Sequence, residues 1–193
     1  EGTMMNMFHH NDEWMISTRS NIGGKNSWDG KIPFSKMFTE IIGDKWFDQL
    51  SKDNCYSFVL RHQKNRIVSP IPVNAIYLIE CHKINDTIES QELPEISGIY
   101  NIINFNHDEV TNYKDDLYFS IKGFTIKTKN NRVNWLNPNY LYVKNLKMNY
   151  NDKFLNYIEL RQTRLLSEYL NYFPEDQYTF TEYRDQFNSI KQK

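Results

Sequence analysis

The sequence predicts an α+β fold with mostly antiparallel sheets and a small helical segment near the C-terminus. Short apolar runs separated by turn residues dominate residues 1–150, as is typical of antiparallel strands. Aromatic residues make up 15% of the 193-residue chain, which favours a sheet-rich core over disorder. From Asn151 onward, apolar residues recur at three-to-four spacing and indicate helices. Residues 1–150 are therefore predicted as one domain and residues 151–193 as a helical appendage.

The first predicted elements are a β-hairpin and a helix. Residues 4–8 and 13–20 are apolar runs around a polar tip at residues 9–12, which predicts the hairpin. After a Gly/Asn-rich loop, apolar residues recur from Phe34 to Leu50 at helical spacing. This pattern predicts an amphipathic helix of roughly four turns, with Ser35 as its N-cap.

The middle of the chain reads as strands with one short helix. Residues 75–81 give the clearest buried strand, because they form a continuous apolar run. A short helix is predicted within residues 108–115. Asn130-Asn131 predicts a tight turn, since asparagine tolerates positive φ. The predicted strands lie at residues 56–60, 67–68, 75–81, 119–128 and 132–136.

The C-terminal segment is predicted to be helical throughout. One or two helices are expected before Phe173-Pro174, because proline stops a helix. Thr179 and Glu182 have capping-box spacing and predict the start of a last helix that runs towards Gln192.

Charge and composition limit the possible partners. The formal net charge is −1, so a nucleic acid would have to meet a local basic patch. No apolar run approaches the roughly 18 residues that a membrane span needs. Cys55 and Cys81 have no paired spacing and are predicted to be reduced thiols of a cytoplasmic protein. Glu1 is not expected to be a natural start, which leaves an N-terminal targeting signal open.

The first residues carry a resemblance to a known superfamily. Glu1-Gly2-Thr3 precedes the predicted hairpin, and residues 16–20, Ile-Ser-Thr-Arg-Ser, close it. This arrangement resembles the start of a covalent nucleotidyltransferase domain, as found in RNA ligases, DNA ligases and mRNA capping enzymes. Their signature is Lys-x-Asp/Glu-Gly-Ser/Thr, and the lysine becomes nucleotidylated. That lysine would lie two residues before Glu1, so the chain is expected to be a fragment that begins just after it.

A second match narrows the resemblance to phage and large-virus RNA ligases. Residues 65–68, Asn-Arg-Ile-Val, are similar to an element of these ligases and form the most specific tetrapeptide in the chain. The alternative interpretation is a turn into an edge strand with Arg66 exposed. Residues 169–175 resemble part of the ligases' C-terminal appendage. The family commonly has a ribose-binding glutamate before Asn-Arg-Ile-Val, where this chain has Ser57, Phe58 and Val59.

The resemblance weakens at the later motifs. Residues 121–127 lie where the family has a metal-holding glutamate, and Lys122 takes its place. The two lysines of the next motif correspond to Asn134 and Leu136, and leucine cannot hold a phosphate. A solvated hairpin with ordinary surface lysines is an equal alternative to a phosphate site here. The nearby positive charges are Lys127, Lys129 and Arg132.

The resemblance implies an ATP-dependent RNA ligase with an ATP-grasp-like ligase domain. The upstream lysine would attack the α-phosphate of ATP with the help of Mg²⁺ or Mn²⁺. The adenylate would then activate an RNA 5′-phosphate for joining to a 3′-hydroxyl, in a viral or phage protein of the host cytoplasm. No catalytic residue and no metal ligand is assigned within this chain. The expected nucleotide-binding residues are Glu1, Gly2, Arg19, Lys122, Lys127 and Arg132.

Two alternatives remain at this point. The departures at Lys122, Asn134 and Leu136 motivate a catalytically decayed member that binds nucleotide or RNA without joining it. An interaction module unrelated to nucleotides would require the ordered matches to arise by chance.

Overall fold

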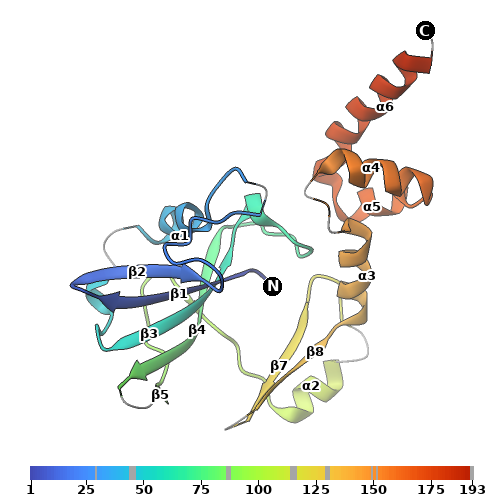
Figure 1. Ribbon diagram of the computed structural model, residues 1–193. Coiled ribbons are helices and arrows are strands. Elements are labelled where there is room, and N and C mark those ends of the chain that lie inside the picture. The colour runs from blue at the N-terminus through green and yellow to red at the C-terminus, as the bar shows by residue number, and fades with distance from the viewer. Residues whose placement is uncertain are drawn as a thin grey trace. The chain divides into compact units, whose positions relative to one another are not determined.

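The computed structural model divides the chain into two compact units, residues 1–109 and residues 110–193 (Figure 1). The α+β class is confirmed, since helices and sheets are both present and, among the described residues, all strand ladders but one are antiparallel. The predicted boundary near residue 150 lies within the second unit. The described residues are 1–28, 30–43, 47–85, 88–113, 117–128, 131–148, 150 and 152–191.

The first unit is built on one sheet with the strand order β2-β1-β3-β4-β5, and β6 lies beside β4. The predicted first hairpin is confirmed. Its tip residues Asn11 and Asp12 both have positive φ, which these residue types tolerate in a tight turn. The strands are β1 Thr3–His10, β2 Glu13–Thr18, β3 Asn54–Arg61, β4 Ala75–Ile84, β5 Ile88–Ser90 and β6 Tyr100–Asn101.

Helix α1, Phe34–Ile42, packs against one face of this sheet (Figure 1). The predicted helix is too long, because the chain leaves the helical conformation at Gly43, where φ is 63°. A separate 3₁₀ turn, η1, follows at Phe47–Gln49. Trp46, which the prediction includes, lies outside the described residues.

The start of α1 is held by backbone rather than by a side chain. The predicted N-cap at Ser35 is wrong, since Pro33 occupies that position and makes no side-chain cap. The N–H groups of Phe34 and Ser35 instead donate to the carbonyls of Asn26 and Gly24, each at 2.9 Å. The Gly/Asn-rich loop therefore provides the partners that a capping side chain would otherwise supply.

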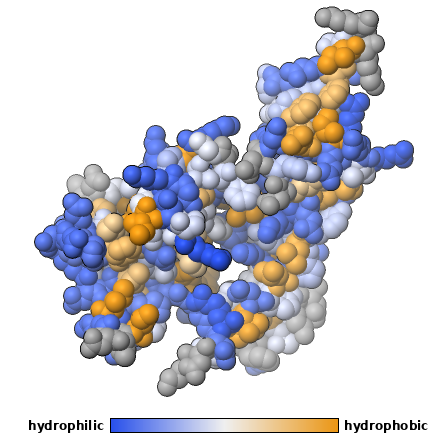
Figure 2. Space-filling view, in the orientation of Figure 1, coloured by the Kyte–Doolittle hydropathy of each residue, from blue (hydrophilic) through white to orange (hydrophobic). Residues whose placement is uncertain are grey.

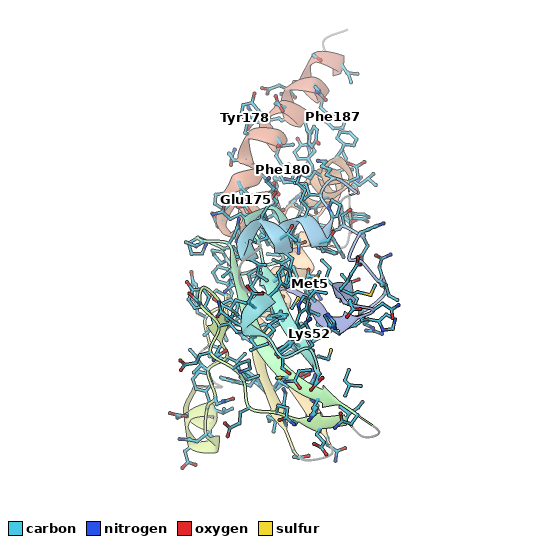
Figure 3. All side chains as sticks on the ribbon, turned by 90° about the vertical axis from the view of Figure 1, so that its left-hand side faces the viewer. Met5, Lys52, Glu175, Tyr178, Phe180 and Phe187 are labelled. Carbon is cyan, nitrogen blue, oxygen red and sulfur yellow. The ribbon has the colours of Figure 1, made fainter. Side chains whose placement is uncertain are left out.

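The core of the first unit lies between α1 and the sheet. Met5, labelled in Figure 3, is fully buried, and the rings of Phe38 and Phe58 meet at 5.5 Å between centroids. Because successive strand residues point to opposite faces, their neighbours Asn6 and Ser57 belong to the other face of the sheet. That second face carries the candidate site described below.

The second unit combines the sheet of β7 and β8 with helices and a 3₁₀ turn. Helix α2, His107–Tyr113, confirms the predicted short helix and spans the boundary between the units. Strand β7 is shorter than the predicted strand, which began at Phe119. Lys129 and Asn130 lie outside the described residues. The other elements are β7 Gly123–Lys127, β8 Arg132–Leu136, α3 Pro138–Lys147, α4 Lys153–Gln162, α5 Leu166–Tyr172, η3 Pro174–Asp176 and α6 Gln177–Lys191.

Two helix starts differ from the predicted ones. Helix α3 is not among the predicted helices, although Asn137-Pro138 is a recognised start signal with asparagine as N-cap and proline at the first helical position. The capping-box prediction is wrong, because α6 begins at Gln177 and Thr179 lies inside it.

The C-terminal helices pack around aromatic side chains. Phe180 and Phe187 both project from α6 (Figure 3), and Phe180 is packed against Tyr157 at 5.4 Å between centroids. The carboxylate of Asp176 is buried, where it accepts the Tyr169 hydroxyl at 2.6 Å and forms an ion pair with Lys153. Figure 2 shows hydrophobic surface over these helices, and their exposed apolar residues include Leu155 and Ile190.

Asn137 joins the loop before β7 to the start of α3. Its amide nitrogen donates to the carbonyls of Leu117, Tyr118 and Ile121 at 3.3, 3.0 and 2.8 Å. Its side-chain oxygen accepts the N–H of Asn139 at 3.0 Å and so caps the helix. Only 1% of Asn137 is exposed, so each of these groups would lose its partner without water to replace it.

We expect the substitution Asn137→Ala to destabilise the protein by about 2–4 kcal/mol, since it removes the cap and leaves buried carbonyls unpaired. Urea unfolding followed by circular dichroism measures this change. Asn145→Ala, at an exposed position of the same helix, is the matched control and should stay within roughly 0.5 kcal/mol of the wild type. Equal stability of both variants would contradict the assignment.

Candidate functional site

The carboxylate of Glu1 holds the loop that follows β3. It accepts the backbone N–H of Val68 at 3.1 Å and that of Ser69 at 2.9 Å. The predicted strand at residues 67–68 is therefore wrong, because these N–H groups bond to a side chain and the backbone bends there. We name this interaction the Glu1 anchor.

A second contact joins the same two segments. The side-chain nitrogen of Asn65 donates to the Thr3 hydroxyl at 2.8 Å. Thus Glu1-Gly2-Thr3 and Asn65-Arg66-Ile67-Val68, which are some sixty residues apart in the sequence, are bonded to each other. These are the two stretches on which the ligase resemblance most depends.

Gly2 allows the chain to pass close to β3. Its φ is 143°, and a Cβ atom at this position would lie 2.5 Å from the carbonyl oxygen of Leu60. Both observations require glycine, because other residues rarely adopt this φ and a carbonyl cannot move aside. The role of Gly2 that can be read from the structure is therefore backbone geometry, and a nucleotide contact stays a prediction.

The loop held by the Glu1 anchor is also fixed by His62. This side chain is buried, and its Nδ1 accepts the N–H of Lys64 at 3.2 Å, which caps the short 3₁₀ turn η2, Gln63–Asn65. A ring nitrogen that accepts an N–H carries no proton, so the proton of a neutral imidazole lies on Nε2. Nε2 faces the Glu40 carboxylate of α1 at 3.3 Å.

Two arginines lie at the same end of the sheet as Glu1. Arg19 follows Thr18, the last residue of β2, and Thr18 pairs with Met5 near the start of β1. The Arg19 side chain is exposed. Arg66 is partly buried and donates through Nε and Nη2 to the carbonyl of Val68, at 3.1 and 2.9 Å. Glu1, Gly2 and Arg19 are thus brought to one end of the sheet.

A row of polar residues crosses the face of the sheet opposite α1. The ladders pair Ser17 with Asn6, Asn6 with Ser57, and Ser57 with Glu80. The Ser57 hydroxyl donates to Asn6 Oδ1 at 2.9 Å. Among the residues that the structure describes, neither the Asn6 amide nitrogen nor the Ser17 hydroxyl has a recorded hydrogen-bond partner. We call these four residues the polar row.

A β-bulge decides which residue ends the polar row. The register between β3 and β4 shifts between Ser57 and Phe58, so that Phe58 pairs with Leu78 but Ser57 pairs with Glu80. Ile79 is the extra residue, and without the bulge it would lie opposite Ser57. The Glu80 side chain is 18% exposed, and His82 Nε2 lies 3.6 Å from its carboxylate. Glu80 is not among the residues predicted from the sequence, because a register shift leaves no local signal.

The three remaining predicted residues belong to the second unit and do not form one cluster. Lys127 and Arg132 are paired across the β7–β8 ladder. Lys122 precedes β7 at the other end of the hairpin, roughly 16 Å away along a strand. Desolvation lowers the pKa of Lys127, although its side chain is mostly exposed. Two cationic side chains therefore stand at paired positions near the tip of this hairpin.

The positions that depart from the ligase motifs have other roles in this hairpin. The Asn134 side chain accepts the Thr125 hydroxyl at 2.9 Å. Leu136 is 39% exposed and pairs with Gly123. Neither offers a positive charge to a phosphate.

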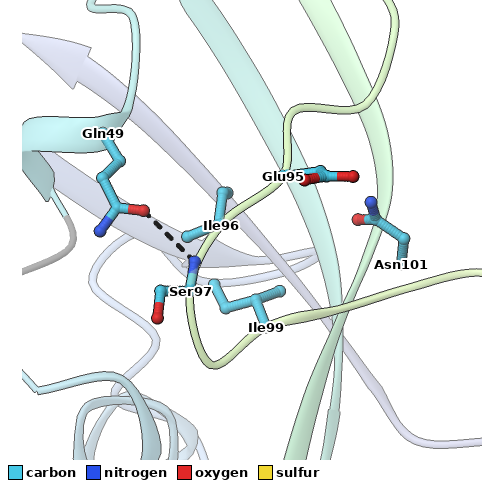
Figure 4. Close-up of a pocket in the computed structure, with 6 residues that line it drawn as sticks. All are labelled: Gln49, Glu95, Ile96, Ser97, Ile99 and Asn101. Atoms are coloured by element: carbon cyan, nitrogen blue, oxygen red, sulfur yellow. Dashed lines mark hydrogen bonds between the residues drawn. The ribbon is translucent and has the colours of Figure 1, made fainter.

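A hollow of about 560 Å³ lies elsewhere on the first unit, away from the Glu1 anchor (Figure 4). Gln49 Oε1 accepts the N–H of Ser97 at its side, at 3.3 Å, and Glu95 is its charged residue. Within the described ranges, no three His, Cys, Asp or Glu side chains lie close enough to share a metal ion. Likewise, no helix in that part of the chain is both long and apolar enough to cross a bilayer.

No protein-family model matches this chain, and the comparison with curated proteins found no match. Any assignment of function therefore depends on the residues themselves and on their geometry.

We expect Glu1→Gln to loosen the loop of residues 66–69, because an amide has only one acceptor oxygen for the two N–H groups. Amide hydrogen exchange at Val68 and Ser69 should accelerate roughly tenfold, the scale of one charge-assisted hydrogen bond. Glu13→Gln, at an exposed position of β2, is the control and should leave both rates unchanged. Unchanged rates in the Glu1 variant would contradict the Glu1 anchor.

Proposed function

We propose that this chain is part of an RNA ligase-like nucleotidyltransferase that uses ATP. The observation that supports the proposal is the pair of bonds between its two ligase-like stretches, from Glu1 to Val68 and Ser69 and from Asn65 to Thr3. Residues that resemble a family by sequence alone need not meet in space, whereas these do.

The polar row suits the ribose of the nucleotide. A vicinal diol has two hydroxyls, each of which donates one hydrogen bond and accepts others. Glu80 is an acceptor, Asn6 Nδ2 is a donor, and Ser57 Oγ keeps its acceptor capacity after donating to Asn6. Arg19, exposed at the end of β2, would then face the phosphates.

The proposed reaction requires a lysine two residues before Glu1 in the natural protein. Its amine nitrogen would bond to the α-phosphorus of ATP while the bond to the β-phosphate oxygen breaks, releasing pyrophosphate and one proton. Transfer of the adenylyl group to an RNA 5′-phosphate would return the amine. Attack by a 3′-hydroxyl would then form the phosphodiester and release AMP. Mg²⁺ or Mn²⁺ would enter with the ATP phosphates and offset their charge.

A second function is favoured by particular positions in the second unit. Lys122 replaces a carboxylate, and neither Asn134 nor Leu136 supplies the expected phosphate-side cation. These positions support a decayed member of the same family, which binds nucleotide or RNA in the cytoplasm but joins nothing.

Covalent labelling by ATP, together with a measurement of ATP and RNA binding, distinguishes the two proposed functions. The chain, extended by its natural upstream residues, is incubated with α-labelled ATP and Mg²⁺ or Mn²⁺, denatured and counted. Retained label that is lost when the upstream lysine is replaced by alanine supports the ligase-like enzyme. ATP binding without label supports the decayed binder. Neither label nor binding of ATP or RNA overturns both.

We expect Glu80→Gln to weaken discrimination between ribose and deoxyribose. The wild type should bind ATP roughly tenfold more tightly than 2′-deoxy-ATP, the scale of one hydrogen bond to a charged group. The Glu80 variant should prefer ATP by about twofold or less, as measured by calorimetric titration. Glu89→Gln, an exposed carboxylate on β5, is the matched control. An unchanged preference in the Glu80 variant would exclude the polar row as the ribose contact.

A further inference from the structure

An open groove lined by aromatic rings lies within the second unit. Its volume is about 470 Å³. The ring centroids of Tyr118 and Phe119 lie 4.4 Å apart. Phe119 meets Tyr172 edge-on, with 5.0 Å between their ring centroids. Tyr118 is 67% exposed, so its ring is available to a ligand. The lining residues are Leu117, Tyr118, Phe119, Asn139, Tyr142 and Tyr172, and we call this site the aromatic groove.

The walls of the aromatic groove are fixed before any ligand binds. Asn137 holds the carbonyls of Leu117 and Tyr118, and Asn139 Nδ2 donates to Leu117 as well, at 2.9 Å. The loop that carries two of the rings is therefore bonded to the start of α3. A preformed wall lowers the entropic cost of binding.

The charge beside the aromatic groove is negative. The Tyr142 hydroxyl donates to Glu168 Oε1 at 2.6 Å, and this hydrogen bond raises the pKa of Tyr142, so the tyrosine remains a neutral donor. Among the described residues, Glu168 forms no ion pair, and its Oε2 has no recorded partner. Within the same described residues, Asn139 Oδ1 has no hydrogen-bond partner either. Ring faces next to such acceptors are suited to a cation.

We propose that the aromatic groove binds an arginine side chain of a partner polypeptide. A guanidinium is planar, stacks on aromatic faces and carries five N–H donors. The donors match the acceptors at Glu168 and Asn139, while the plane matches the exposed face of Tyr118. This site shares no residue with the proposed nucleotide site and does not depend on it.

Two other occupants fit the same observations less well. A methylated ammonium would stack on the rings but has few or no N–H groups for the carboxylate and amide oxygens. A nucleobase would also stack, but its phosphates would meet the unpaired charge of Glu168. Arginine is therefore favoured over a methylated ammonium by its hydrogen bonding, and over a nucleotide by its charge.

The test uses N-acetyl-arginine methylamide as the probe and the shifts of aromatic NMR signals as the measurement. Saturable shifts of the Tyr118 and Tyr142 rings are expected, with a dissociation constant in roughly the millimolar range for a single side chain. The citrulline analogue has the same shape without the charge and should bind about tenfold more weakly. Trimethyl-lysine and oligouridylate probes represent the other two occupants.

Variants locate the binding to the aromatic groove. Glu168→Gln should weaken arginine binding by about tenfold. Tyr118→Ala, at an exposed position, should weaken it by about threefold. Glu159→Gln is the matched control, because Glu159 also accepts a tyrosine hydroxyl, that of Tyr150 at 2.5 Å, but lies outside the groove. Its affinity should equal that of the wild type.

Each remaining outcome overturns the proposal. No saturable shift of the groove signals, or equal binding of arginine and citrulline, would show that the charge of Glu168 is not used. Tighter binding of trimethyl-lysine or oligouridylate would assign the groove to another ligand. Unchanged affinity in a folded Glu168→Gln variant, with its fold checked by circular dichroism, would place any arginine contact elsewhere.

Discussion

The first unit depends on one carboxylate at the beginning of the chain. Glu1 accepts the N–H groups of Val68 and Ser69, so the loop after β3 bonds to the residue that precedes β1. Without that acceptor, two partly buried N–H groups would have no partner, and such groups cost free energy wherever water cannot reach them. The anchor also brings Gly2 against Leu60, where only glycine fits. The contact thus joins the residues before β1 to the loop after β3.

In the second unit, Asn137 plays the part that Glu1 plays in the first, because its side chain bonds to the backbone of a distant loop. One buried amide joins the loop before β7 to α3, and it thereby fixes the wall of the aromatic groove. In both units a single polar side chain satisfies backbone groups from a distant loop. A loop held in this way can present side chains in fixed positions, which is what binding requires.

Local patterns predicted much of the secondary structure. The first hairpin, the strands at 56–60 and 75–81, and the strand at 132–136 have the alternation or continuous apolar runs that set strands. Predictions failed where long-range contacts intervene. Residues 67–68 have strand-forming side chains, yet the N–H groups of Val68 and Ser69 bond to Glu1. The helix from Phe34 ends early at Gly43, where the backbone takes a positive φ that glycine permits.

The sequence by itself determined which residue types are present and in which order, including Glu1-Gly2-Thr3, Arg19 and Asn65-Arg66-Ile67-Val68. It also determined the strand alternation that places Asn6 and Ser57 on one face. Only the tertiary structure decided that Glu80 lies opposite Ser57, since this depends on a one-residue bulge at Ile79. A shift of one residue in the strand register turns a different side chain towards each face of a sheet. The register depends on the packing of the whole sheet, which no local sequence pattern contains.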